Sequence, residues 1–394
     1  MYTRRDFLNY IAGGMASAII GARSVFAAAP TDNRMIVLFL RGGLDGLHAL
    51  APYMDPDYKR LRPMLVRASD RAGGLIDLDG YFGMHPALEP LIPLYRAKEL
   101  LFIPAASTQY RDRSHFDGQN LLENGSGAPH GADTGWLNRA ILGLNAGDRR
   151  LGLSIGPAIP LILQGDARVQ TWAKSRLPEV DEDFLNRLMR SYRHDALFMD
   201  ALHDARGALR PNMDMAGADN GWRQGDSFPL AARAAADLLS HPDGPRIGVI
   251  EFDGWDTHFD QNRRLSSLLQ RLSQGLVELK TGLGSEWSRT TVLVVSEFGR
   301  TAAENGSRGT DHGTGGLAML AGGAVAGGRI VGDWPGLSNS ALWQGRDVRS
   351  VNSYEALFKD ILMTHLGLDE AYVETQVFPN SRAFQPMGGL LRKA

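Results

Sequence analysis

The chain has 394 residues and a formal net charge of −2. Proteins that bind nucleic acid usually carry a basic stripe, so this near-neutral balance leads us to expect no nucleic-acid partner. The sequence has no cysteine, which excludes disulfide bonds, thiolate metal sites and a cysteine nucleophile.

The first 29 residues are predicted to be a signal peptide and are set apart from the fold. Residues 3–8, TRRDFL, have a twin-arginine pattern, and the three alanines at 27–29 suit a signal peptidase. The apolar segment between them is too short, and too rich in glycine and alanine, to span a membrane stably. We therefore expect export to the periplasm by the twin-arginine pathway, without stable membrane insertion. The alternative is an ordinary amphipathic helix.

Beyond this leader, short apolar runs alternate with amphipathic segments. Strands are predicted at residues 35–40, 100–104, 152–156, 246–252, 291–295, 317–320 and 329–331. Helices are predicted at residues 86–97, 228–240, 259–279 and 353–366. This order predicts an α/β fold with a mostly parallel central sheet and helices on both faces. Residues 30–394 are expected to form a single domain, with a helical insertion or cap at about residues 177–226.

Two charged residues follow the first predicted strand. Arg41 and Asp45 lie in the glycine-rich turn RGGLDG, and ligands of open α/β sheets bind at the carboxyl ends of strands. Both are therefore candidate site residues. Because Asp followed by Gly is also a common turn pair, an ordinary turn is the alternative for Asp45.

The segment RSHFDGQ follows the second predicted strand. Its Ser114 stands where a helix can begin, and Asp117 three residues later resembles a capping box. The functional alternative is an anion site, since a helix N-terminus favours negative charge and Arg111 and Arg113 flank the serine. A hydroxyl there could attack phosphorus or sulfur if a metal lowered its pKa.

Residues 152–156, GLSIG, match the G-x-S-x-G pattern of a nucleophilic serine. That pattern requires a strand that passes directly into a helix, but Pro157 and Pro160 follow here. We therefore predict a strand at Ser154 and not a serine-esterase site.

The densest group of ligand-type side chains follows the predicted strand at 246–252. Residues 253–260, DGWDTHFD, hold three carboxylates and a histidine. A helix cap at Asp256 accounts for one carboxylate but not for the group. Carboxylates and neutral imidazoles bind divalent metals, so Asp256 and His258 are predicted metal ligands.

The strand at 291–295 leads into SEFGRT and, after a glycine-rich loop, into TDHG. Glu297 offers a carboxylate, Arg300 an anion-binding group, and Asp311 with His312 a metal-ligand pair. The alternatives are a surface ion pair between Glu297 and Arg300 and a hydrogen-bonded turn at Asp311 and His312.

These segments together resemble one known family. An exported bacterial family, filed under the uncharacterised domain numbered 1501, is similar in FLRGGLDGLHALAPY, RSHFDGQ, TGWLNRA, GWDTHFDQ, VVSEFGRTAAENGSRGTDHGTGG and NSYEALFKDILMTHLGL. That family is placed in the alkaline phosphatase-like superfamily, which includes phosphatases, sulfatases and cofactor-independent phosphoglycerate mutases. The resemblance implies a three-layer αβα sandwich and a two-metal site.

The resemblance also implies roles for single residues. Ser114 resembles the superfamily's nucleophile, and Asp256, His258 and His312 resemble the ligands of one metal. The second metal's ligands are altered: Glu297 keeps a carboxylate, but Phe298 and Arg41 stand where the superfamily has a histidine and an aspartate. Asp45 is the nearby substitute for that aspartate.

Two hypotheses follow. The first is an exported metal-dependent hydrolase of phosphate or sulfate esters, in which Arg41 or Arg300 binds the anion and Ser114 or a water attacks. Its divalent metal, Zn, Mn or Ca, is assigned to the candidate ligands Asp45, Asp256, His258, Glu297, Asp311 and His312. The second is a non-catalytic exported protein that binds an anionic small molecule, a glycan or a protein partner. Sulfatases of the formylglycine type are excluded because no C/S-x-P-x-R pattern occurs.

Overall fold

A computed structural model describes residues 31–66, 74–144, 150–173, 182–193, 195, 198–199 and 227–392. The chain divides into two compact units, and the larger one comprises residues 28–172 and 224–394. The twin-arginine leader lies outside the described residues. So does much of the predicted insertion at 177–226, in which the described helix is α7 (Glu182–Tyr192).

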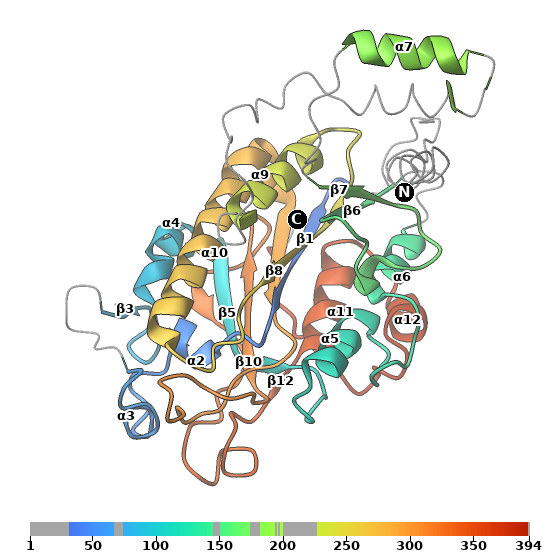
Figure 1. Ribbon diagram of the computed structural model, residues 1–394. Coiled ribbons are helices and arrows are strands. Elements are labelled where there is room, and N and C mark those ends of the chain that lie inside the picture. Colours follow the sequence, from blue (N-terminus) through green and yellow to red (C-terminus); the bar gives the residue numbers. More distant parts are fainter. Residues whose placement is uncertain are drawn as a thin grey trace, which may run out of the picture. The chain divides into compact units, whose positions relative to one another are not determined.

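A nine-stranded sheet forms the centre of the larger unit (Figure 1). Its order is β11-β5-β10-β9-β1-β8-β6-β7, and β12 also pairs with β5. The strands are β1 (Arg34–Arg41), β5 (Leu100–Ser107), β6 (Gly152–Ile155), β7 (Val169–Trp172), β8 (Ile247–Asp253), β9 (Thr290–Val295), β10 (Gly316–Ala321), β11 (Arg329–Ile330) and β12 (Asn352–Ser353). Strand β10 pairs antiparallel with β5 and β9, whereas the other pairings in this sheet are parallel. The predicted mostly parallel sheet is confirmed.

Helices cover both faces of this sheet (Figure 1). On one face lie α9 (Ser227–Ser240), α10 (Gln261–Leu283) and α4 (Ile92–Arg96); on the other lie α5 (His115–Asn124), α6 (Trp136–Gly143) and α11 (Tyr354–Thr364). The shorter elements are β2 (Leu50–Ala51), β3 (Ile76–Asp77), β4 (Gly83–Met84), α2 (Gly46–Ala49), α3 (Tyr58–Leu61), α12 (Glu370–Tyr372), η1 (Pro86–Leu91), η2 (Leu161–Leu163), η3 (Gly284–Arg289) and η4 (Val373–Val377). The layers make the predicted three-layer αβα sandwich.

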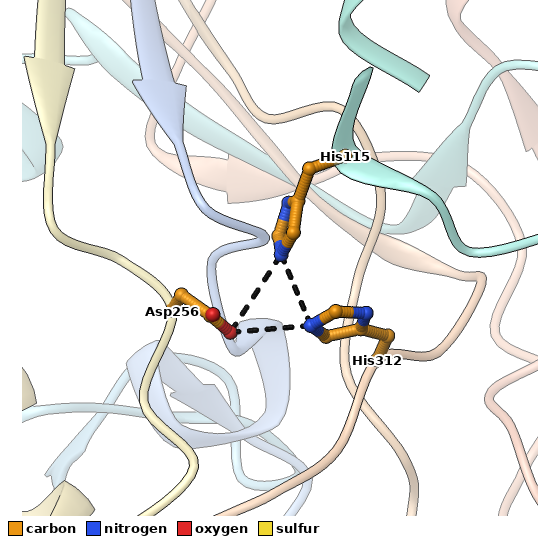
Figure 2. A group of neighbouring side chains, drawn as sticks. All are labelled: His115, Asp256 and His312. Carbon is orange, nitrogen blue, oxygen red and sulfur yellow. Dashed lines mark hydrogen bonds and ion pairs between the residues drawn. The ribbon is translucent and has the colours of Figure 1, made fainter. Parts of the chain in front are cut away.

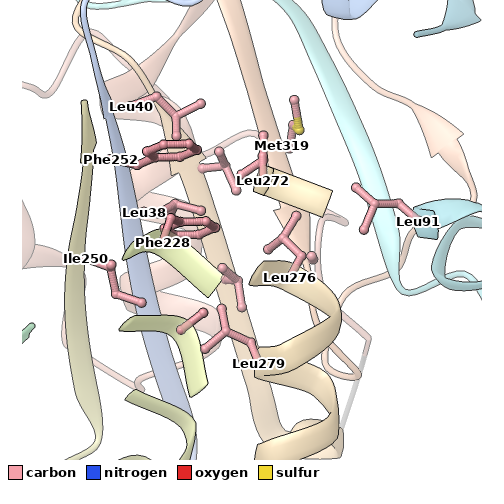
Figure 3. Close-up of a cluster of buried hydrophobic side chains, with 14 of the residues drawn as sticks. Leu38, Leu40, Leu91, Phe228, Ile250, Phe252, Leu272, Leu276, Leu279 and Met319 are labelled. Carbon is pink, nitrogen blue, oxygen red and sulfur yellow. The ribbon is translucent and has the colours of Figure 1, made fainter. Parts of the chain in front are cut away.

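Alternate side chains of β1 enter two separate cores. Leu38 joins the core beneath α9 and α10, where Phe228 and Leu276 meet it (Figure 3). Val37 points to the opposite core, which contains Trp136 and Phe358. Because successive side chains of a strand face opposite sides, a continuously apolar strand suits a sheet covered on both faces.

Local differences from the predicted elements have simple causes. The helix predicted at 86–97 is the 3₁₀ helix η1 followed by the short α4, because Pro90 and Pro93 lack the backbone donors that a continuous α-helix requires. The helix predicted at 259–279 runs from Gln261 to Leu283. Ser154 lies buried in β6 and donates to the Ala158 carbonyl at 3.0 Å, in agreement with the strand prediction. Among the described residues, no helix is long and apolar enough to cross a membrane.

Candidate metal centre

The site lies at the edge of the sheet where the parallel strands end. Strands β1, β8 and β9 end there, and β10 begins there because it is antiparallel to β9. The chain after β8 carries Asp256 and His258, and the chain before β10 carries His312. Strand β5 also ends at this edge, and the segment after it leads to His115 at the start of α5. The topology therefore brings three separate loops together.

Two imidazoles and one carboxylate converge in this place with His258 beside them, and Figure 2 shows His115, Asp256 and His312 pointing toward one another. The Nε2 atom of His312 lies 3.0 Å from Nε2 of His115 and 3.0 Å from Nε2 of His258. Oδ1 of Asp256 lies 3.0 Å from His258 Nε2 and 3.3 Å from His312 Nε2. The same oxygen is 3.7 Å from His115 Nε2. We call these four residues the ligand cluster.

An oxygen holds the second ring nitrogen of each histidine in the cluster. His115 Nδ1 lies 2.6 Å from Glu297 Oε1, and His258 Nδ1 lies 3.1 Å from Asp311 Oδ1. Metal-binding histidines typically donate Nδ1–H to such a carboxylate, which leaves Nε2 as the metal ligand. Glu297 and Asp311 therefore contact the Nδ1 atoms and orient the histidines, whereas Asp256 lies on the Nε2 side.

At His312, a backbone oxygen instead of a carboxylate lies next to Nδ1. Its Nδ1 lies 3.0 Å from the carbonyl oxygen of Arg113. Because a carbonyl can only accept, His312 Nδ1 carries the proton and Nε2 presents its lone pair to the cluster. Each histidine thus turns its Nε2 atom toward Asp256 Oδ1, at 3.7 Å for His115, 3.0 Å for His258 and 3.3 Å for His312.

These spacings fit a small tetrahedral cation. Ligand atoms about 2.0 Å from a tetrahedral zinc lie about 3.3 Å from one another, and those of His115, Asp256 and His312 lie 3.0 to 3.7 Å apart. His258 Nε2 lies 3.0 Å from two of them but is not close to all three. The histidine and aspartate side chains of the cluster remain 23–42 % exposed. The donor set therefore fits a metal that solvent and small molecules can reach.

The buried Arg300 side chain forms an ion pair with Asp256. The guanidinium is 1 % exposed, and its Nη1 donates to Asp256 Oδ1 at 2.6 Å. Burial raises the pKa of Asp256, but interactions with His115, His312 and Arg300 outweigh that effect and hold the pKa far below its usual value. Asp256 is therefore ionised, and Arg300 is already paired with a carboxylate.

Glu297 is a fully buried carboxylate just after β9. Its Oε1 accepts from the Gly42 backbone N–H at 2.9 Å and from Gln119 Nε2 at 3.0 Å, and its Oε2 accepts from Ser296 Oγ at 2.9 Å. Burial raises the pKa of Glu297, but hydrogen bonds from His115 and Gln119 outweigh burial and keep the pKa below its usual value. The charge that orients His115 is thus itself fixed by three other donors.

The loops that carry the ligands are joined to each other. Asn305 Nδ2 donates to the His258 carbonyl at 2.9 Å and to Asp311 Oδ1 at 3.1 Å. Gly309 packs directly on the backbone of His258, and a Cβ there would lie 2.2 Å from the His258 carbonyl carbon. This close approach requires glycine at position 309.

The structure places Asp45 away from the ligand cluster. Asp45 is 1 % exposed, and its Oδ2 lies 2.7 Å from Arg62 Nη1 and accepts from Gln261 Nε2 at 2.6 Å. Its Oδ1 caps α2 by accepting from the His48 backbone N–H at 3.2 Å. Asp45 is therefore the centre of a buried polar network beneath the site.

The Arg41 guanidinium is paired with two carboxylates and one side-chain amide. Its Nη2 lies 2.9 Å from Glu123 Oε1, its Nε donates to Glu251 Oε1 at 2.6 Å, and its Nη1 donates to Gln119 Oε1 at 2.7 Å.

Phe298, beside Glu297 in the sequence, packs against His115, and the centroids of the two rings lie 4.7 Å apart.

Ser114 occupies the N-cap position of α5. Its Oγ accepts from the Asp117 backbone N–H at the long distance of 3.5 Å, and its own N–H donates to the Tyr110 hydroxyl at 3.2 Å. This is the geometry of the capping alternative.

Sequence reasoning missed His115 and placed Arg113 only as a flank of an anion site at Ser114. His115 directly follows Ser114, and the capping pattern of Ser114 with Asp117 drew the interpretation of that segment to the serine. The available signal was a histidine at a strand-to-helix junction, on the same edge of the sheet as His258 and His312. The contact that Arg113 makes with His312 comes from a backbone carbonyl, which no residue pattern reports.

The model of one family, described as Protein of unknown function (DUF1501), matches residues 32–373. A search of curated proteins finds no match.

Several solved structures are similar. One titled "Crystal structure of Ps i-CgsB" has 10 % identity and a TM-score of 0.40, with 90 % of this chain and 77 % of that chain covered. A protein in the alkaline phosphatase superfamily from Vibrio parahaemolyticus has 11 % identity and a TM-score of 0.36, with 81 % and 69 % covered. A mutant of TAB5 alkaline phosphatase has 12 % identity and a TM-score of 0.37, with 77 % and 95 % covered. On the family match, this chain belongs to the family Protein of unknown function (DUF1501).

Proposed function

We propose that this protein is an exported, metal-dependent hydrolase of phosphate or sulfate esters. The observation that carries the proposal is the convergence of His115 Nε2, His312 Nε2 and Asp256 Oδ1 at 3.0–3.7 Å, with His258 Nε2 3.0 Å from the last two. Each histidine also has an oxygen at Nδ1, as metal-binding histidines do. Packing alone does not require this arrangement, because the three histidine side chains are 23–39 % exposed and water could satisfy each Nε2 instead.

The proposed metal is zinc, held by His115, Asp256, His258 and His312. Imidazole nitrogen suits zinc, whereas calcium takes six to eight oxygen ligands. When bound, the cation would act as a Lewis acid that polarises an ester oxygen. Glu297 and Asp311 would keep His115 and His258 in the tautomers that bind it.

The protein's own charges suggest how an anionic ester would be held. Arg41 and Arg300 are both paired with carboxylates, so the ester's negative charge would rest mainly on the metal. The N-terminus of α5 lies at His115, and its macrodipole favours an anion there. Arg300 would act indirectly, because its contact with Asp256 Oδ1 keeps that ligand ionised and in place.

Water is the proposed nucleophile. The Ser114 hydroxyl faces the N-terminus of its own helix, at 3.5 Å from the Asp117 backbone nitrogen, whereas the ligand cluster is partly open to solvent. Ser114→Ala should therefore keep hydrolytic activity and lose about 1 kcal/mol of stability from the helix cap. Complete loss of activity with bound zinc unchanged would instead identify Ser114 as the nucleophile.

The test combines metal analysis with hydrolysis. Protein purified without chelator is analysed for bound metal and assayed with p-nitrophenyl phosphate and p-nitrophenyl sulfate, alone and with several divalent ions added. His258→Ala and His312→Ala should lose both metal and activity. His130→Ala is the matched control, since His130 is 69 % exposed and contacts Asp117 instead of the cluster. Wild-type protein with neither stoichiometric metal nor hydrolysis would refute the proposal.

One observation favours the second candidate, a non-catalytic exported protein that binds an anionic small molecule, a glycan or a protein partner. All four ligand atoms come from protein side chains, and four protein ligands are typical of structural zinc sites. That candidate predicts stoichiometric zinc and a large rise in melting temperature with zinc, but no hydrolysis of either ester.

Export is proposed on the leader, which lies outside the described residues. Replacing Arg4 and Arg5 with lysine should retain the protein in the cytoplasm, as measured by cell fractionation. Unchanged periplasmic recovery would contradict the twin-arginine route.

A further inference from the structure

Arg113 has a backbone conformation that residues other than glycine rarely adopt. Its φ is 63°, in the left-handed region. Such a conformation persists only where the surrounding structure enforces it, and such residues cluster at functional sites. The position is two residues before His115, in the segment that leads into α5.

The backbone of Arg113 contacts the ligand cluster directly. Its carbonyl oxygen lies 3.0 Å from His312 Nδ1. His115 and His258 are oriented by carboxylate side chains, but His312 depends on this carbonyl. The direction of the carbonyl is set by the backbone dihedral angles around residue 113, so any force that fixes those angles also fixes the ring of His312.

The side chain of Arg113 supplies such a force. Its Nε donates to Asp347 Oδ2 at 2.8 Å, and its Nη2 donates to Gln344 Oε1 at 2.9 Å. Asp347 is 0 % exposed, and its backbone pairs with Thr301, which follows Arg300. A buried carboxylate on a fixed backbone thus anchors the guanidinium, and the anchored side chain restrains its own main chain.

We propose that Arg113 is a positioning residue of the metal centre. Its ion pair with Asp347 holds residue 113 in the left-handed conformation, and that conformation directs the carbonyl at His312 Nδ1. The inference rests on the proposed metal site, but it assigns a function to a residue that contacts the metal only through His312.

The test compares three substitutions at one position. Arg113→Ala removes the anchor and keeps the Cβ that disfavours positive φ, whereas Arg113→Gly removes the anchor but accepts positive φ without strain. Zinc affinity, measured by competition with a chromophoric chelator, should fall about 10- to 100-fold in Arg113→Ala. It should fall less in Arg113→Gly and least in Arg113→Lys. Asp347→Asn should weaken zinc in the same direction as Arg113→Ala.

The control is Lys98→Ala, because Lys98 is also a charged residue with positive φ, at 60°, but is exposed and lies at the other end of β5. This variant should bind zinc as the wild type does. A second readout is the tautomer of His312 in zinc-free protein, from long-range ¹⁵N–¹H NMR spectra. The wild type should show the proton on Nδ1, and Arg113→Ala should show a mixture of tautomers.

Two results would overturn the inference. If wild type binds zinc but Arg113→Ala binds it within twofold and keeps the Nδ1 tautomer, Arg113 has only a structural role and the metal centre stands. If wild type binds no zinc, the metal centre and the role of Arg113 both fail.

Discussion

Nδ1 of His115 lies 2.6 Å from Oε1 of Glu297, a residue 182 positions away in the sequence with no exposed side-chain surface. This contact ties the start of α5 to the end of β9 and selects Nε2 of His115 as the nitrogen that faces the cluster. Glu297 thus orients His115, the candidate ligand that sequence reasoning missed.

Glu297→Gln is expected to weaken zinc binding about 10- to 100-fold, because outer partners of metal-binding histidines have effects of that size. The substitution keeps the volume and removes the charge that fixes the His115 tautomer. Isothermal titration with zinc measures the effect. Glu89→Gln, at an exposed position on η1, is the control and should bind zinc normally. Equal affinity in the Glu297 variant and wild type would contradict this role.

His115→Ala is expected to remove stoichiometric zinc while the protein stays folded. The ring is 23 % exposed, so its loss leaves a solvent-accessible gap, and no buried cavity forms in either core. Equilibrium dialysis against zinc, with circular dichroism to verify the fold, tests the prediction. Full zinc occupancy in this variant would show that His115 is a neighbour of the metal and not a ligand.

Gly309→Ala and Gly306→Ala form a matched pair in one loop. A Cβ at position 309 would lie 2.2 Å from the His258 carbonyl carbon, whereas a Cβ at position 306 would meet nothing within 4 Å. Gly309→Ala should therefore displace His258, cost about 1–3 kcal/mol of stability and weaken zinc at least about tenfold. Gly306→Ala should change neither. Thermal melts and zinc titrations of both variants check this, and equal behaviour of the pair would refute the proposed contact between the loops.

The buried pair of Asp45 and Arg62 predicts a dependence of stability on pH. Burial raises the pKa of Asp45, but Arg62 and the other partners outweigh it and lower the pKa below the usual value. The unfolded-state pKa of Asp is about 3.9. The stabilisation is therefore fully present above about pH 4 and is lost as the pH falls through the folded-state pKa.

Asp45→Asn should lower the free energy of unfolding at pH 7 by about 3–5 kcal/mol, because it leaves Arg62 buried without its counter-ion. It should also flatten the decline of stability below pH 4. Urea unfolding at several pH values measures both effects. A variant that matches wild type at pH 7 would show that the pair contributes nothing.

The fold could be predicted well because its signals are local. Runs such as residues 35–40 and 291–295 are continuously apolar, and β1 and β9 are buried on both faces as a result. The placement of Asp256, His258 and His312 at one edge of the sheet followed from strand direction alone.

The inner geometry of the site could not be predicted in the same way. Whether Glu297 and Asp311 contact a metal or a histidine Nδ1 depends on loop positions to within about one bond length, which no sequence spacing encodes. Asp45 meets Arg62, the C-cap residue of α3, 17 positions along the chain, and the sequence carries no periodicity that indicates this pairing. His115 was hidden by the capping pattern next to it.

X-ray absorption spectroscopy at the zinc edge tests the central claim most directly, because it reports the atoms bound to the metal without any assumption about substrate. For protein loaded with one equivalent of zinc, the account predicts three imidazole ligands and one or two oxygen ligands at about 2.0–2.1 Å, and one imidazole fewer in His115→Ala. A spectrum with oxygen ligands alone, or a wild-type protein that does not retain one equivalent of zinc, would contradict it.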